Sequence, residues 1–315
     1  METLTPSSQK YTRDTTYNLQ ELLGTDIRTV LPGALRETAQ ETCEVLVDLL
    51  HELGTEKLAR HCDKYSPDSL TRLHPDSCPS YPEPATIKVI NDDTLNAAIK
   101  LSKSAQNVDG NLPPASLRPA VVNFANSRSP GGGWLNGAMA QEEAICYRSS
   151  LAMSLSNNHH YPLAKDEGLY SPYVLVIRDD LASGHRLYSG HPAGFPVVSA
   201  LTIAALNKPQ IRIFRRHSAD KLVFAQDRDR DATKGKMRLA LRMAARHGHA
   251  NLVLGALGCG VFDNPPEDVA HCWLEVMRED EFSGNWWRKV WFAVYDPKGE
   301  GNFGIFDRVL SGRKV

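Results

Sequence analysis

Two adjacent glutamates, Glu142 and Glu143, follow a glycine-rich stretch and have the side chains that acid–base chemistry needs. An apolar run ends at Asn126 and leads into three consecutive glycines, 131–133. Glycines take positive φ readily and let backbone amides approach a ligand closely, which favours an anion such as a phosphate group. A helix is expected to begin at about Met139, and its free amides and dipole would add to that site. The simpler alternative is a plain turn followed by ordinary first-turn carboxylates.

The two glutamates are expected to have different functions. Neighbouring residues of a helix point about 100° apart, so two adjacent carboxylates suit separate roles better than a shared one. We therefore interpret one as the acid–base group and the other as a residue that positions the substrate.

A second glycine-rich turn follows the apolar run 251–256 and contains Gly258, Cys259 and Gly260. A lone Gly-x-Gly is weak evidence for a binding loop and is equally consistent with a structural turn. Cys259 as a nucleophile is the rival interpretation. It is disfavoured because the motif places no base beside the thiol, and a buried thiol in a turn is more common.

The elements that must position these loops alternate along the chain. Strands are predicted at the apolar, β-branched runs 86–90, 120–124, 173–177, 195–203, 251–256 and 290–295. Helices are predicted between several of them, at about 139–154, 232–247 and 268–278. Such alternation indicates an α/β fold with a mainly parallel sheet covered on both faces, and ligands of such sheets collect beyond the carboxyl ends of the strands.

The amino-terminal part differs from the rest. Apolar residues three or four positions apart between Leu35 and Leu50 predict an amphipathic helix, and residues up to about 60 are expected to be helical. Five prolines between Ser66 and Pro84 predict a long loop. Residues 1–84 are therefore interpreted as a tail, helical extension and loop that pack on a catalytic domain at 85–315, the whole forming one structural unit.

Composition limits the class of protein. The 36 basic and 37 acidic residues nearly cancel, which argues against binding to nucleic acid through bulk charge, so an anionic ligand requires a local site. No apolar run is long enough to span a membrane, and the polar residues 1–18 do not resemble a signal peptide. Six widely spaced cysteines indicate reduced thiols and a cytoplasmic or nuclear protein.

The strings Asn-Phe-Ala-Asn (123–126), Pro-Gly-Gly-Gly (130–133) and Gln-Glu-Glu (141–143) resemble the signature of microbial-type poly(ADP-ribose) glycohydrolases. Gly-Cys-Gly-Val-Phe-x-Asn (258–264) is similar to the second loop of the same family. The resemblance covers residues 30–315 and is loose outside the two loops. It implies a macrodomain-like three-layer α/β/α sandwich with a mixed, mainly parallel sheet and a helical amino-terminal extension.

The resemblance also implies roles for individual residues. Glu143 corresponds to the catalytic glutamate, while Glu142 and Asn126 would hold the ribose at the scissile bond. Phe303 would lie on the adenine side, where a core position is the equally acceptable alternative. The remaining substrate-binding positions implied by the two motifs are Gly131, Gly132, Gly133, Gln141, Gly258, Cys259, Gly260, Val261 and Phe262.

The activity expected from the resemblance is hydrolysis of ribose–ribose O-glycosidic bonds, mainly at chain ends, with release of ADP-ribose. Such cleavage passes through an oxocarbenium-like state and needs a proton donor, which Glu143 can be if burial, Glu142 and the ligand diphosphate keep it protonated. Expected partners are poly(ADP-ribose), ADP-ribose and ADP-ribosylated proteins, without membrane or nucleic acid, and a monomer is expected. A mono-ADP-ribosyl hydrolase and a non-catalytic reader of ADP-ribose remain as alternatives.

No cofactor or metal is expected. His61, Cys62, His74 and Cys78 match no standard zinc spacing. The alternating Asp and Arg residues at 227–231 are interpreted as a solvated helix entry with local ion pairs, with a grip on the polymer as the alternative.

Overall fold

The computed structural model describes residues 33–102, 114–156, 160–216 and 219–315. The expectation that residues 1–18 form no signal peptide lies outside the described residues, as does the part of the amino-terminal extension before residue 33.

A mixed sheet forms the middle layer of the fold. Within the described residues it has seven strands in the order β1-β4-β5-β3-β8-β9-β2, and all neighbours from β5 to β2 are parallel. β4 is antiparallel to β5 and to β1. The strands, in chain order, are β1 (Asp63–Tyr65), β2 (Ile87–Ile90), β3 (Ala120–Phe124), β4 (Gly168–Leu175), β5 (Val197–Ile203), β8 (Asn251–Gly255) and β9 (Lys289–Ala293).

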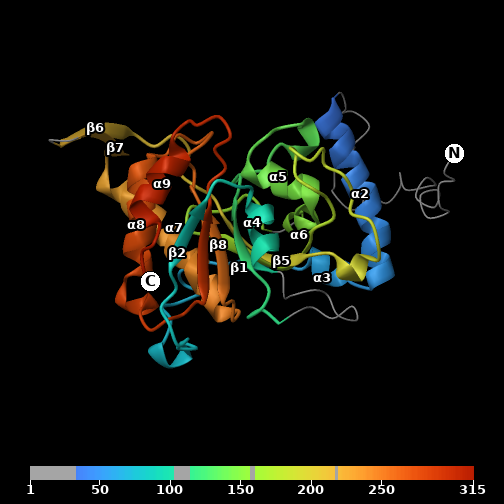
Figure 1. The fold of residues 1–315 in the computed structure, drawn as a ribbon, viewed down its shortest axis with the longest axis horizontal. Coiled ribbons are helices and arrows are strands. Elements are labelled where there is room, and N and C mark those ends of the chain that lie inside the picture. The colour runs from blue at the N-terminus through green and yellow to red at the C-terminus, as the bar shows by residue number, and fades with distance from the viewer. Residues whose placement is uncertain (1–32, 103–113, 157–159, 217–218) are drawn as a thin grey trace.

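Helices cover both faces of this sheet (Figure 1). On one side lie α7 (Asp227–Arg246), α8 (Pro266–Met277) and α9 (Asn302–Leu310). On the other lie α2 (Ala34–Leu53), α3 (Glu56–Arg60), α4 (Thr94–Leu101), α5 (Gln141–Arg148) and α6 (Leu151–Leu155). The predicted three-layer α/β/α architecture with a mainly parallel sheet and a helical amino-terminal part is confirmed. Every residue of β5 is buried, as expected for a strand packed on both faces.

The region predicted as one helix from Met139 to Ser154 is two helices. Ser149 is extended and pairs with Val176, so the helix must stop after Arg148. Ser150 then exchanges hydrogen bonds with Leu175: its N donates to Leu175 O at 3.0 Å, and its Oγ accepts from Leu175 N at 2.9 Å. Pairing with the neighbouring strand therefore overrides the helical pattern at this point.

Several elements were not predicted. The amino-terminal side of the proline-rich loop supplies β1, and a short helix, α4, follows β2. After β5 the chain forms a two-stranded hairpin of β6 (Ile211–Arg216) and β7 (Ala219–Phe224), which is separate from the main sheet. Phe303, expected on the adenine side, lies in the first turn of the helix α9, Asn302–Leu310.

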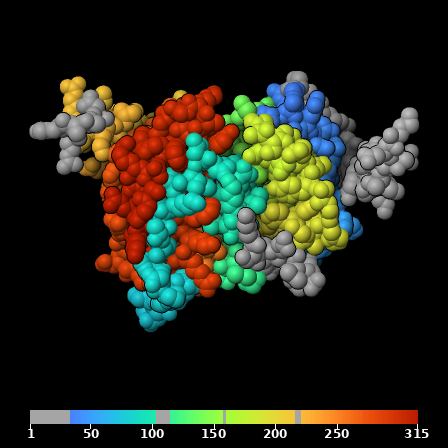
Figure 2. All heavy atoms as spheres, in the orientation of Figure 1, coloured from blue at the N-terminus to red at the C-terminus, as the bar shows by residue number. Residues whose placement is uncertain are grey.

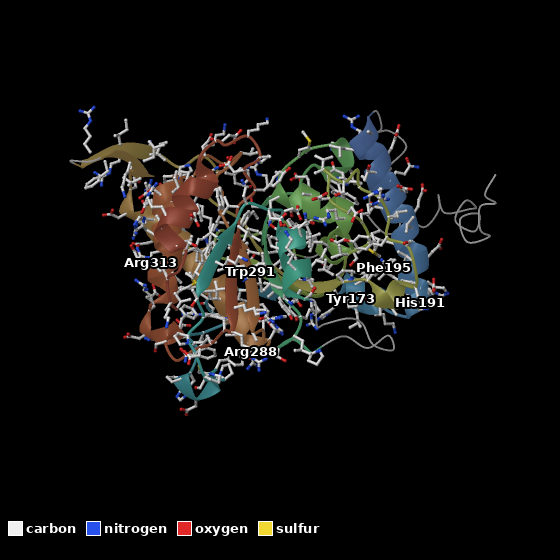
Figure 3. All side chains as sticks on the ribbon, viewed as in Figure 1. Tyr173, His191, Phe195, Arg288, Trp291 and Arg313 are labelled. Carbon is white, nitrogen blue, oxygen red and sulfur yellow. The ribbon has the colours of Figure 1, made fainter. Side chains whose placement is uncertain are left out.

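The amino-terminal helix α2 packs through one face, as its apolar spacing predicts. Leu46, Leu49 and Leu50 form a core cluster with Tyr173 of β4 and with Phe195. Figure 3 shows Tyr173 and Phe195 on this side of the molecule, near α3. Because β1 also comes from before residue 84, the sheet itself extends across the predicted boundary, and the division at that residue stays a prediction.

The proline-rich stretch is a loop, as predicted, apart from one short 3-10 turn at Pro75–Ser77. It is attached to the body by Leu73 N, which donates to Glu281 Oε1 at 3.0 Å, and by Leu70 O, which accepts from Arg242 Nη1 at 3.3 Å. Among the described residues, no helix has the length and apolar character that crossing a membrane requires.

The parallel strands end at one edge of the sheet. The loops that leave β3, β8 and β9 at this edge contain Asn126, Gly258 and Asp296. Since β3, β8 and β9 are consecutive neighbours, these loops emerge side by side, where α/β sheets bind ligands.

His249 lies at the opposite edge of the sheet, just before β8 begins. Its side chain is buried in the neutral form. Its Nδ1 lies 3.0 Å from Arg118 O and its Nε2 lies 2.8 Å from Tyr170 Oη, so Nδ1 carries the hydrogen and Nε2 accepts. Burial, with the Arg118 charge nearby, lowers the pKa of His249 to about 3 from an ordinary value of 6.5.

This histidine makes the stability of the fold depend on pH. Between the two pKa values the unfolded chain binds the extra proton, so the free energy of unfolding falls as the pH drops below about 6.5. We predict that His249→Gln flattens this dependence by about 1.4 kcal/mol per pH unit between pH 6 and 4, measured by urea unfolding. The same change at the exposed His74 should keep the wild-type slope. Equal slopes for wild type and His249→Gln would contradict the assignment.

Candidate functional site

The first loop owes its shape to glycines in the left-handed region. Gly131 has φ +72° and Gly132 has φ +61°, which side chains other than glycine rarely adopt. A Cβ on Gly131 would lie 2.9 Å from the Trp134 ring. The predicted positive φ is found at Gly131 and Gly132 but not at Gly133, which has φ −103°. The turn brings bare backbone close to the start of α5, and its contact with a ligand stays a prediction.

Glu143 lies directly against this turn. Gly133 N donates to its Oε1 at 2.9 Å, and a Cβ on Gly132 would be only 2.3 Å from the same oxygen. Its Oε2 has no hydrogen-bond partner within the described part of the chain. The side chain is buried, with 8% exposed. One carboxylate oxygen is thus fixed by the backbone, and the contact of the other with a ligand stays a prediction.

Glu142 is held much more tightly. Its Oε2 accepts from Asn126 N at 2.7 Å, and its Oε1 accepts from Asn123 Nδ2 at 3.2 Å. Asn123 Nδ2 also lies 3.3 Å from Thr202 Oγ1 of β5. Burial raises the pKa of Glu142 to about 8, although the donors from Asn126 and Asn123 oppose the rise. The two glutamates therefore occupy different environments, as expected for neighbouring residues of a helix that point about 100° apart.

Asn126 and Gln141 both hold backbone in place. Asn126 Oδ1 accepts from Arg128 N at 2.8 Å and from Ser129 N at 3.2 Å. Gln141 Oε1 accepts from Phe124 N at 2.8 Å, and its Nε2 donates to Val122 O at 2.7 Å and to Thr94 Oγ1 at 3.1 Å. The Gln141 amide thus ties α5 to the end of β3, and its direct contact with a ligand stays a prediction.

Two side chains that hold the first loop in place were not identified from the sequence. Tyr147 Oη donates to Trp134 O at 2.7 Å and lies 3.0 Å from Ala138 O. From α2, Arg36 Nε donates to Asn136 O at 2.9 Å. Both side chains donate to backbone carbonyl oxygens, which every residue has, so no sequence motif identifies them.

The second loop turns at Gly258, which has φ +73°. A Cβ there would lie 2.5 Å from Asn264 Nδ2, so only glycine fits. Asn264 Nδ2 donates to Leu206 O at 2.7 Å and to Phe262 O at 3.1 Å, which closes the loop onto the segment after β5. Asn264, which stands at the end of the motif, is the residue that holds this turn together.

The predicted ligand-binding positions of the second loop differ in exposure. Gly260 is exposed, Val261 is 68% exposed and Phe262 is half-buried. Cys259 is buried, and burial raises the pKa of its thiol well above the ordinary value. A nucleophilic thiolate is therefore not favoured, in agreement with the interpretation of Cys259 as a structural thiol.

The loop after β9 is the third loop that emerges at the carboxyl-terminal edge of the parallel strands. The Asp296 carboxylate accepts from Glu300 N at 2.6 Å, Gly301 N at 2.9 Å and Phe303 N at 3.2 Å. Burial opposes the charge of Asp296, but these amide donors outweigh it and lower its pKa. Phe303 begins α9 and packs, partly buried, against the core, whereas Tyr295 is 61% exposed beside Asp296. Tyr295 is an exposed aromatic at the strand end that the sequence analysis missed.

The other residues considered for chemistry have structural partners. No group of three or more His, Cys, Asp or Glu side chains is placed to hold a metal ion within the described ranges. Arg230, from the alternating Asp and Arg run, binds Asp268 at 2.8 Å and Glu275 at 2.6 Å. This agrees with a helix entry stabilised by ion pairs.

The family model for the catalytic domain of microbial-type poly(ADP-ribose) glycohydrolase matches residues 39–179. None of the curated proteins compared matches the chain.

Solved structures give broader matches. Poly(ADP-ribose) glycohydrolase from Thermomonospora curvata is 30% identical, with a TM-score of 0.68 and coverage of 87% of this chain and 98% of that one. Its structure with the inhibitor ADP-HPD matches with a TM-score of 0.66. The Deinococcus radiodurans enzyme in complex with ADP-ribose is 27% identical, with a TM-score of 0.62 and coverage of 82% and 97%.

Identity of 30% across nearly the full length of a relative, joined to the family match over the first loop, is sufficient to assign the chain. It belongs to the microbial-type poly(ADP-ribose) glycohydrolase family.

Proposed function

We propose that this chain hydrolyses the ribose–ribose O-glycosidic bonds of poly(ADP-ribose), mainly from chain ends, and releases ADP-ribose with Glu143 as general acid and base. The observation that carries the proposal is the position of the Glu143 carboxylate, one oxygen of which is fixed by Gly133 N at the glycine turn. Relatives of the same fold are solved with ADP-ribose and with the inhibitor ADP-HPD, which supports this ligand class.

The chemistry follows from the two environments of the glutamates. Glu143 protonates the 2′-oxygen of the leaving unit as the bond from that oxygen to the ribose anomeric carbon breaks. A water molecule then attacks that carbon and returns a proton to Glu143. Glu142, whose two oxygens are already bonded to Asn126 and Asn123, is suited to orient the ribose and the loop rather than to transfer protons.

The remaining parts of the substrate have matching surfaces. The diphosphate is proposed to lie against the glycine turns at 131–133 and 258–260. In the first turn Gly132 N already donates to Ser129 O and Gly133 N to Glu143 Oε1, so that turn would contribute close backbone contact rather than free amides. We infer that the half-buried Phe262 packs against the ribose that is cut, and that the exposed Tyr295 ring stacks on adenine.

The cysteines bear on the cellular location. The six cysteines are free thiols in the structure, which suits a reducing compartment, so we place the protein in the cytoplasm or nucleus as a monomer acting on ADP-ribosylated proteins.

The first test replaces the acid–base group. Glu143→Gln should lower the rate of ADP-ribose release from purified poly(ADP-ribose) at least about 100-fold, because the proton donor is lost. ADP-ribose binding, measured by calorimetry, should stay within a few-fold of wild type. Glu37→Gln on α2 serves as a control with wild-type rate. If wild type binds ADP-ribose but releases none from polymer, the protein is a reader; release only from mono-ADP-ribosylated substrates would make it a mono-ADP-ribosyl hydrolase.

The second test concerns the glycine turn. Gly132→Ala would place a methyl group against Glu143 Oε1 and force an alanine to φ +61°. We expect both ADP-ribose binding and polymer hydrolysis to fall more than about tenfold, since the turn and the carboxylate must both move. Gly235→Ala in α7, where nothing lies within 4 Å, should leave both unchanged. Wild-type binding by Gly132→Ala would refute the close packing of turn and carboxylate.

The third test separates the two aromatics. Tyr295→Ala should weaken ADP-ribose binding about fivefold to tenfold with an unchanged melting temperature, because the ring is exposed and available for stacking. Phe303→Ala should lower the melting temperature, because this ring packs against the core. The reverse pattern would return the adenine contact to Phe303.

A further inference from the structure

The β6–β7 hairpin projects from the body of the molecule and carries exposed apolar side chains. Figures 1 and 2 show it extending beyond α8 at the upper left. Ile213 is 57% exposed, Phe214 is 46% exposed and Leu222 is 44% exposed. Side chains of this kind on a projecting hairpin do not contribute to the core, so their exposure needs an explanation.

The hairpin is also the basic part of a nearly neutral chain. Residues 211–224 contain four Lys or Arg and one acidic residue, whereas the whole chain has a net charge of −1. Such a local excess of positive charge complements a polyanion. Aromatic rings interleaved with cations are the combination that binds the bases and phosphates of single-stranded polynucleotides.

One face of the hairpin presents both groups together. Arg212 and Phe214 are two residues apart on β6, so their side chains point to the same face about 7 Å apart. Phe214 pairs across the hairpin with Lys221. Because Lys221 is paired with Glu267, Arg212 is the cation of this face that can contact a diphosphate while a base stacks on the Phe214 ring.

The base of the hairpin is fixed to the body. Phe224 is buried, and its N donates to Asp268 Oδ2 of α8 at 3.1 Å. Lys221 forms an ion pair with Glu267 of the same helix. The exposed part is therefore held in a defined position.

The chain that leads into the hairpin contacts the candidate site. The segment between β5 and β6 runs along both loops: Ile203 O accepts from Ala125 N at 3.0 Å, and Lys208 N donates to Phe262 O at 3.0 Å. Phe262 is the residue proposed to pack on the ribose that is cut. Under the proposed function the rest of the polymer continues from this ribose, and the segment bonded to Phe262 leads into the hairpin.

We propose that the Arg212–Phe214 face of the hairpin binds the next ADP-ribose units of the polymer, on the leaving side of the cut bond. This inference rests on the proposed function for the identity of the polymer. It makes the hairpin the part of the protein that distinguishes long chains from free ADP-ribose.

The test compares Arg212→Glu/Phe214→Ser with a matched surface control, Lys57→Glu/Leu58→Ser on α3, where Leu58 is 38% exposed. On chains of many units the hairpin variant should raise KM about tenfold with kcat unchanged, since the loss corresponds to about one base stack with its phosphate contact. The Kd for free ADP-ribose should stay within twofold. The control should match wild type, and the difference between hairpin variant and wild type should shrink at high salt.

Other outcomes overturn the proposal. Equal KM values for wild type and hairpin variant would show that the hairpin does not touch the polymer. An equal loss of free ADP-ribose binding would show that the change acts through the second loop. Lower affinity for a single-stranded oligonucleotide with unchanged affinity for poly(ADP-ribose) would make nucleic acid the partner. The single variant Phe214→Ala, checked by melting temperature, covers the case in which the double variant does not fold.

A binding measurement separates this inference from the proposed function. The affinity for long poly(ADP-ribose) is measured without turnover in the Glu143→Gln background, with and without the hairpin changes. A tenfold difference supports the hairpin site even if the wild type proves not to hydrolyse the polymer, and equal affinities refute it even if hydrolysis is confirmed.

Discussion

The attachment of the Glu142 carboxylate to the end of β3 is the interaction on which the site depends. Asn126 N and Asn123 Nδ2 both donate to it, so a buried acidic group on α5 is bound to a strand and to the loop that leaves it. This fixes the first turn of α5 and hence places Glu143 against Gly133 N. Burying an acidic group is unfavourable unless hydrogen bonds compensate, so these donors are necessary for the position of Glu143.

The candidate site could be predicted where its chemistry requires particular residue types. Gly132 and Gly258 are irreplaceable because of their φ values and contacts, and the glutamates stand in a recognisable string. Tyr147 and Arg36 could not be found in this way, because they bond to carbonyls that every residue has. For Gln141 the position in the motif was informative, but spacing does not tell a residue that binds the ligand from one that holds the backbone.

The fold was predicted best where strands are buried on both faces. Continuous apolar runs located β3, β5 and β8 to within two residues. The hairpin and β1 were missed because exposed or very short strands mix polar and apolar residues without a clear period. For α4, a capping signal was present: Asp93 accepts from Leu95 N at 2.8 Å and from Asn96 N at 3.1 Å. The end of α5 at Ser149 could not be predicted, because it depends on pairing with Val176, which is distant in the sequence.

The position of α2 has a consequence for where the folded unit begins. Thr42 Oγ1 donates to Tyr147 O at 2.8 Å, and Arg178 Nε donates to Thr42 Oγ1 at the same distance, so α2 is joined both to α5 and to the end of the β4 segment. A fragment that starts at residue 85 would lose β1, uncover Leu46 and its neighbours, and remove the partner of Asn136 in the first loop. The part of the described chain that holds Glu143 in place therefore includes α2, which begins at Ala34, well before β2, the first parallel strand of the sheet, at Ile87.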